Sequence, residues 1–334
     1  MTTLRTVLTI LVPVLCGYVL ARRRLLHDAA LEDLSKLLIN FLLPCFLFTG
    51  VVAGIATLDW KNGLILLLAS PLYTFGGLAL GWALARMMRI ESNQRRAVTA
   101  CIGFANAGYI PIGIVPALVA ATDLFGETEA AKTRGLIYVA MFLFLWTPLM
   151  WSLGVNMFRA KADGERKWWQ AISPPFVAVL IGVAIGSSPL QNLLVGINAP
   201  LGWLQEGLYM LGTTATPLVM LVLGGTLAEI HWNGHVRINA IASVVIARSI
   251  VMPLVVFGLI VLAVKQFGKP DDPLMLFILL LQGTMPPATN LAVIARRYDS
   301  HPQLVSAILL VSYLAALISI PLWLALFVRW LSAP

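Results

Sequence analysis

The side chains able to do chemistry in this sequence are concentrated in two short segments inside otherwise apolar runs. One segment, Cys101–Pro111, lies in the middle of the run Ala97–Thr122. The other, Gln282–Asn290, lies in the run Pro273–Ala295. A proline removes an amide donor from a helix and pushes the residue before it out of the helical region, so both runs are predicted to be broken helices. The residues expected to form a site at the breaks are Asn106, Gly108, Tyr109, Pro111, Thr284, Pro286, Pro287, Thr289 and Asn290.

Broken backbone inside an apolar run leaves amide and carbonyl groups that must be buried in protein or line a wet cavity. The N-terminus of each second half-helix, predicted near Asn106 and near Pro287, carries about half a positive charge. Two such ends at one place favour binding of a carboxylate or a similar anion. The alternative is that both breaks are ordinary proline kinks whose asparagines bond back to the chain.

Two further polar residues are candidates for the site. Arg248 lies well inside the run Ile238–Val264. If this run spans a membrane, inserting an arginine near its middle costs ~2.5–3.5 kcal/mol, which makes Arg248 a functional candidate. It either neutralises a substrate carboxylate or braces broken-helix carbonyls, and the sequence leaves both open. Asn40, one turn before Pro44, either faces substrate or has a packing or capping role.

Other kinds of chemistry have little support in the sequence. The three cysteines lie inside apolar runs without paired spacing, which argues against a disulfide framework or a zinc site. His231 and His235 have no third ligand nearby, and the adjacent acids Asp271 and Asp272 are explained by a proline-flanked loop. We therefore expect no catalytic residues, no metal site and no cofactor.

The elements that must position these residues are predicted to be membrane-spanning helices. Of 334 residues, 59% are apolar and only 11% are charged, which is too little charge for the surface of a soluble domain. Runs that reach or approach the ~20 residues needed to cross a bilayer occur ten times. The expected fold class is therefore an all-α integral membrane protein. The predicted spans are Thr6–Ala21, Leu37–Leu58, Asn62–Ala85, Ala97–Thr122, Gly135–Phe158, Ile172–Ser188, Gly207–Ala228, Ile238–Val264, Pro273–Ala295 and Gln303–Val328.

Basic residues concentrate in alternate loops between these spans. When the N-terminus is placed outside, most lysines and arginines fall on the inner side, and this positive-inside bias predicts that both termini are non-cytoplasmic. The net charge of +8 is spread over loops and forms no basic face, which argues against nucleic-acid binding. The expected partner is the lipid bilayer.

The prolines indicate a duplication. Within spans, Pro44 has a counterpart in Pro217, and Pro71 has one in Pro253. The predicted organisation is a first five-helix repeat at 1–158, a cytoplasmic linker at 159–171 and a second repeat at 172–334. Because five spans is an odd number, the second repeat must enter the membrane from the opposite side. Inverted repeats with broken helices are typical of secondary transporters.

Four segments in the right order resemble the auxin efflux carrier family, which includes bacterial malonate, malate and oxalate permeases and, more distantly, the plant PIN-FORMED carriers. These segments are Leu34–Pro44, Asn106–Pro111, Thr216–Gly224 and Pro286–Tyr298. The resemblance covers essentially the whole chain. Family members place one asparagine at the break of span four and another beside the prolines of span nine, and Asn106 and Asn290 match those positions.

The resemblance implies ten transmembrane helices in two inverted five-helix repeats, with broken helices 4 and 9 crossing. It implies a scaffold of helices 1, 2, 6 and 7, and a transport domain of helices 3–5 and 8–10 that moves in an elevator-like manner. The implied function is secondary transport of a small organic anion. We expect a malonate-like dicarboxylate as substrate and a bacterial inner membrane as location. A homodimer is a candidate assembly.

Two other functions have weaker support in the sequence. A sodium-coupled symporter of the bile-acid type has a similar crossover, but sodium sites prefer hard oxygen ligands and often a carboxylate. Neither Ala97–Thr122 nor Pro273–Ala295 contains an acidic residue. An intramembrane enzyme would need a nucleophile with a base, a metal cluster or paired carboxylates, and no such set lies at membrane depth.

Overall fold

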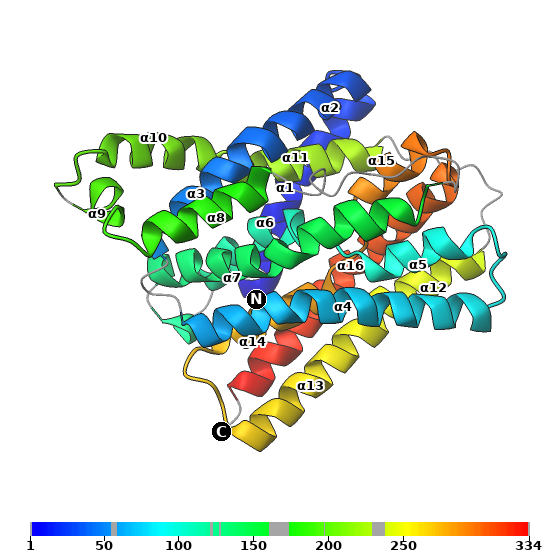
Figure 1. Cartoon of the computed structure of the whole chain (residues 1–334). Helices are drawn as coiled ribbons and strands as arrows, with labels where there is room; N and C mark the ends of the chain where they lie inside the picture. Colours follow the sequence, from blue (N-terminus) through cyan, green and yellow to red (C-terminus); the bar gives the residue numbers. More distant parts are fainter. Residues whose placement is uncertain are drawn as a thin grey trace.

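The computed structural model of the protein describes residues 2–54, 59–120, 123–126, 128–159, 174–196, 198–228 and 238–332. In this part of the chain the fold is all-helical and contains no β-strand, only one isolated bridge (Figure 1). The predicted linker 159–171 lies outside the described residues except for Arg159. The predicted fold class, an all-α membrane protein, agrees with this architecture.

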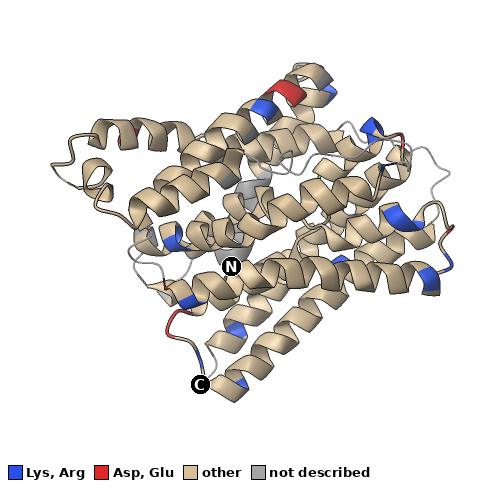
Figure 2. Ribbon diagram, in the orientation of Figure 1, with Lys and Arg blue, Asp and Glu red and all other residues tan. Residues whose placement is uncertain are grey.

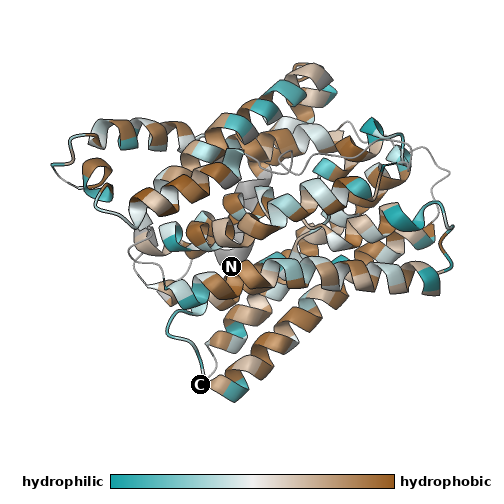
Figure 3. Cartoon of the chain, viewed as in Figure 1, coloured by the Kyte–Doolittle hydropathy of each residue, from teal (hydrophilic) through white to brown (hydrophobic). Residues whose placement is uncertain are grey.

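Six of the described helical stretches are long and apolar enough to cross a membrane. Charged residues lie mainly near the helix ends and in the connecting loops, and apolar residues cover most of the helix lengths (Figures 2 and 3). This distribution is expected of helices whose surfaces face lipid, because there is little water to solvate a charge there. The six stretches are Ala29–Gly54, Trp60–Met87, Ala130–Gly154, Gly202–Ala228, Ile238–Phe267 and Pro302–Leu331.

The remaining predicted spans correspond to shorter helical pieces. One is α1 (Thr2–Arg22), another is α8 (Pro174–Gly186), and the two runs with the candidate site are interrupted. The other helices are α2 (Asp28–Leu37), α3 (Leu43–Gly54), α4 (Trp60–Met87), α5 (Arg95–Gly103), α6 (Tyr109–Val119), α7 (Thr128–Leu149), α9 (Gln191–Leu194), α10 (Gly202–Thr213), α11 (Ala215–Ala228), α12 (Ile238–Ile246), α13 (Met252–Phe267), α14 (Pro273–Thr284), α15 (Asn290–Arg297) and α16 (Pro302–Leu331).

Prolines widen three of these helices without ending them. Single turns of π-helix connect α2 to α3, extend α7, and connect α12 to α13, next to Pro44, Pro148 and Pro253 respectively. Pro253 cannot donate to the carbonyl of Ser249, one turn earlier. The indole Nε1 of Trp323 donates to that carbonyl instead, at 2.9 Å. π-Helical turns often occur at functional sites, and the turn between α12 and α13 contains Arg248.

The helices pack in two groups. In one group α1 lies along α11, and α3 packs against α8 and α10. In the other, α4 lies along α5 and α7, while α16 packs against α12, α14 and α15. Packing between the groups is sparser and involves mainly α3 with α7 and α11 with α6.

A polar cluster fixes the start of α14 against α7. Asp272 Oδ2 accepts a hydrogen bond from Tyr138 Oη at 2.8 Å and lies 2.8 Å from Arg134 Nε, while Oδ1 accepts from the Leu274 amide at 3.1 Å. The carboxylate therefore caps α14 and also pairs a largely buried arginine. The adjacent acids, which the sequence explains only as a loop, thus have different environments, because Asp271 is exposed.

We predict that Asp272→Ala destabilises the protein and that Asp271→Ala does not. Loss of the helix cap costs about 0.5–2 kcal/mol, and leaving partly buried donors unpaired adds about 1–3 kcal/mol. The measurement is thermal unfolding of the purified protein in detergent, followed by tryptophan fluorescence. Equal melting temperatures for the two variants would contradict the capping role.

Candidate functional site

Both candidate segments are interrupted helices, as predicted from their prolines. The first run breaks between α5, which ends at Gly103, and α6, which begins at Tyr109. The second breaks between α14, which ends at Thr284, and α15, which begins at Asn290. Met285, the residue before Pro286, has an extended ψ of 136°. This is the conformation that a following proline imposes.

The two breaks meet and satisfy each other's backbone groups. The main-chain amide of Asn106 donates to the Pro286 carbonyl at 2.8 Å, and the main-chain amide of Ala288 donates to the Phe104 carbonyl at 2.9 Å. Ala105 and Pro287 form an antiparallel bridge between these bonds. Non-helical backbone is tolerated at membrane depth only with such internal pairing. The crossing therefore consists of two short extended segments, each held by the other.

The second half-helices begin slightly later than the sequence predicted. They start at Tyr109 and Asn290, not beside Asn106 and Pro287. Pro111 lies in the first turn of α6, where its missing amide removes no helical hydrogen bond. The residues between the prolines and the helix starts are used for the bridge, so the helices resume only beyond it.

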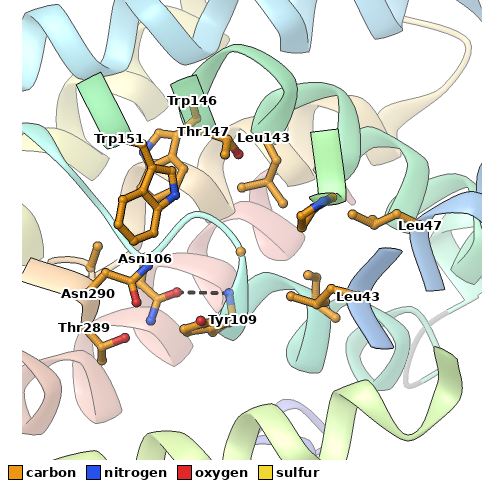
Figure 4. Close-up of a pocket in the computed structure, with 14 residues that line it drawn as sticks. Leu43, Leu47, Asn106, Tyr109, Leu143, Trp146, Thr147, Trp151, Thr289 and Asn290 are labelled. Atoms are coloured by element: carbon orange, nitrogen blue, oxygen red, sulfur yellow. Dashed lines mark hydrogen bonds between the residues drawn. The ribbon is translucent and has the colours of Figure 1, made fainter. Parts of the chain in front are cut away.

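Asn106 is a buried residue that links three parts of the crossing. Its Oδ1 accepts a hydrogen bond from the Tyr109 amide at 3.0 Å (Figure 4). Its Nδ2 donates to the Tyr313 hydroxyl on α16 at 2.6 Å. The same hydroxyl also interacts with the Thr289 side chain. The alternative in which an asparagine bonds back to its own chain is therefore realised for Asn106.

Asn290 differs from Asn106 in this respect. It lies in the first turn of α15 and is partly exposed, and its side chain has no hydrogen-bond partner among the described residues. Asn290 and Asn106 line the same cavity (Figure 4). A free amide beside a helix N-terminus offers both a donor and a positive electrostatic potential.

The cavity itself lies against the N-terminal ends of α6 and α15. Its volume is about 80 Å³. Ligand pockets for drug-sized molecules span roughly 300–1,000 Å³, so this cavity suits only a small solute. Trp146 of α7 and Trp151 of the π-helical turn that follows it lie opposite the two asparagines (Figure 4). The lining residues are Leu43, Leu47, Asn106, Gly108, Tyr109, Ile112, Leu143, Trp146, Thr147, Trp151, Pro175, Ala288, Thr289 and Asn290.

Five of the predicted site residues line this cavity, and six do not. Thr284 donates to the Leu281 carbonyl within α14, and Asn40 is exposed on the turn before α3. Pro111, Pro286 and Pro287 are buried and shape the backbone. The sixth, Arg248, is not among the lining residues and bonds main-chain carbonyls at the crossing. The brace interpretation of this arginine therefore matches the geometry.

Several residues of the site were not predicted from sequence. The cavity is lined by Trp146, Thr147 and Trp151. The Tyr313 hydroxyl accepts a hydrogen bond from Asn106. Thr147 precedes a proline inside a predicted span, which is a weak indication of a functional position. Nothing in the sequence distinguished the aromatic residues from other apolar positions. Gln282 is also new: it is 1% exposed, and its Nε2 donates to the Ala107 carbonyl at 3.0 Å, so it ties α14 to the first break.

A larger cavity of about 420 Å³ lies between α1, α6, α11 and α16. Among the described residues that line it, the polar side chains are Tyr18 and Tyr313, and the Tyr313 hydroxyl already bonds Asn106. The polar groups of the crossing therefore converge on the smaller cavity. We take the smaller cavity as the candidate site.

Comparisons with known proteins agree with this architecture. A family model described as membrane transport protein matches residues 2–324. The chain belongs to the auxin efflux carrier family. The carrier is 24% identical to Protein PIN-LIKES 7 of Arabidopsis thaliana, across 90% of each chain. It is also 28% identical to an uncharacterized transporter of Methanothermobacter thermautotrophicus, across 95% of this carrier and 96% of that protein.

Membership settles two of the sequence-based expectations. The carrier is a multi-pass membrane transporter, and it is not an enzyme. The family model extends over both interrupted helices, so the crossing lies within the part of the chain that defines the family.

Proposed function

We propose that the protein is a secondary transporter of a small organic anion, with a malonate-like dicarboxylate as its substrate. The observation that carries the proposal is the convergence of two helix N-termini on one small cavity. α6 and α15 each direct the positive end of a helix dipole there, and Asn290 adds an unpaired amide. Anions bind at such ends because free amides and the dipole act together.

The cavity has no acidic residue among its lining side chains. A carboxylate side chain in the cavity would repel an anionic substrate. A site for a coupled sodium ion, in contrast, is favoured by a carboxylate ligand. The lining therefore supports an anion site over a sodium site. Trp146 and Trp151 supply apolar surface against which the hydrocarbon part of a small carboxylate can pack.

The architecture that we propose has ten transmembrane helices in two inverted repeats of five. The scaffold comprises α1, α2 with α3, α8, and α10 with α11, while α4 to α7 and α12 to α16 form the transport domain. The denser packing within each group supports this division. Leu43, Leu47 and Pro175 of the scaffold face the crossing across the cavity, so an elevator-like movement of the transport domain would carry the site past them. The proposed setting is a bacterial inner membrane with both termini outside, and a homodimer is the proposed assembly.

Uptake and binding measurements test the proposal. Purified protein should bind malonate in a thermal-shift titration, and proteoliposomes should accumulate labelled malonate; acetate, malate, oxalate and a neutral diamide complete the panel. We predict that Asn290→Ala weakens malonate binding at least about tenfold, because a hydrogen bond to a charged group contributes about 1.5–3 kcal/mol and 1.4 kcal/mol is a factor of ten.

Asn290→Ala should leave the melting temperature of the ligand-free protein nearly unchanged, since the amide has no partner to lose among the described residues. The matched control is Asn192→Ala, which removes the same side chain from an exposed position on α9. Binding of the neutral diamide as tightly as malonate would overturn the anion proposal.

A further inference from the structure

A buried arginine lies where two helix C-terminal ends meet. Arg248 is 2% exposed and belongs to the π-helical turn between α12 and α13. Its Nε and Nη2 donate to the Met285 carbonyl at 2.8 and 2.5 Å, and Nη1 donates to the Ile102 carbonyl at 3.4 Å. Ile102 is in the last turn of α5, and Met285 directly follows α14. One guanidinium thus joins the ends of both first half-helices.

The charges at this point are complementary. Each helix C-terminus carries roughly half a negative charge, so the two ends together match about one positive charge. The hydrogen bonds of Arg248 within the described residues all go to main-chain carbonyls, and the ion pairs of that part of the chain involve other residues. The guanidinium therefore neutralises backbone dipoles and not a carboxylate.

In ion-coupled carriers with broken helices, unwound carbonyls and half-helix C-terminal ends are the groups that coordinate a sodium ion. The Ile102 and Met285 carbonyls are groups of this kind, and here they accept from Arg248. We propose that Arg248 is a tethered cation that occupies the place of a coupling ion at the crossing. The inference rests on the proposed function in treating the protein as a secondary carrier.

Arg248 is then a positioning residue. It does not line the cavity, and it acts by holding the two negative helix ends together. With the negative ends balanced internally, the positive ends of α6 and α15 stay available for an anion. Binding and transport should accordingly need no alkali cation.

The test compares salts on the purified full-length protein without substrate. The melting temperature of the wild type should be the same in sodium, lithium, potassium and choline chloride at equal ionic strength. Arg248→Gln should melt at a lower temperature in choline chloride, and sodium or lithium should restore part of that loss in a saturable titration. Arg248→Lys, which keeps a tethered charge, should show no cation-specific shift.

Trp323→Phe is the matched control, because it removes another donor to a main-chain carbonyl, that of Ser249, beside Arg248. Its loss of stability should be equal in all four salts. A saturable sodium-dependent shift of the wild type would overturn the proposal, as would an identical loss for Arg248→Gln in every salt. If Arg248→Gln does not fold in any salt, the proposal is likewise overturned, because an added cation should then have rescued it.

A second measurement connects the arginine to substrate. Malonate should bind Arg248→Gln at least tenfold more weakly in choline chloride than in sodium chloride, and the wild type equally in both. The thermal shifts by cations need no substrate, so a failure of malonate to bind would count against the proposed function alone.

Discussion

Asn106→Asp will abolish malonate binding while leaving the fold intact. The substitution keeps an oxygen that accepts from the Tyr109 amide, and the Tyr313 hydroxyl can turn to donate to the new carboxylate. Aspartate and asparagine are equally good partners for amides at a helix N-terminus, where negative charge is favourable. An anion in the cavity would, however, face a fixed negative charge. Like charges in contact cost several kcal/mol, so we expect binding to weaken at least about a hundredfold.

The comparison variants separate charge from structure. Asn106→Ala should lose stability as well as binding, because it leaves the part-buried Tyr109 amide without its partner, at about 1–3 kcal/mol, and removes one of the partners of the buried Tyr313 hydroxyl. Asn192→Asp introduces the same charge at an exposed position and should change neither property. Binding is measured by calorimetric titration with malonate, and stability by thermal unfolding. Wild-type affinity in Asn106→Asp would remove the case for an anion at this cavity.

In the first run Pro111 does not itself cause the break, because it lies in the first turn of α6 and the residue before it, Ile110, is helical. The break in the second run could be predicted from sequence because its cause is local. A proline lacks its amide and restrains the residue before it wherever it occurs, and Met285 has the predicted extended backbone. Asn106, five residues before Pro111, was also expected at the site. The points at which the helices resume were missed. They depend on the bridge between Ala105 and Pro287, which pairs segments far apart in the chain.

The remaining wall of the cavity could not be predicted for a related reason. Trp151 and Tyr313 belong to long apolar helices in which aromatic residues serve equally well as lipid-facing or core positions. Only the packing of α7 and α16 around the crossing distinguishes them. The sequence left the role of Arg248 open, because the position of a residue along a span does not tell which way its side chain points. Its hydrogen bonds to the Ile102 and Met285 carbonyls are those of a brace between the two first half-helices.

Gly224→Ala will disrupt the packing of α11 on α1 and lower the stability of the protein. A Cβ at this position would lie 1.8 Å from the Val14 carbonyl oxygen, and a Cβ at Gly17 would lie 1.9 Å from the Leu221 carbonyl oxygen. Both neighbours are backbone atoms of the facing helix, so no side chain can turn away. Small residues allow membrane helices to approach this closely. The added methyl forces the helices apart along their whole contact.

The sign of the effect distinguishes packing from helix propensity. Overpacking typically costs about 1–3 kcal/mol, and a clash with the backbone of the facing helix α1 places Gly224→Ala at or above the upper end. Gly258→Ala on α13 adds the same methyl where no atom lies within 4 Å, so alanine's better propensity should raise stability by up to about 1 kcal/mol. Thermal unfolding in detergent should therefore move in opposite directions for the two variants. If both melt above the wild type, α1 and α11 do not pack through these glycines, and the proposed scaffold loses its closest contact.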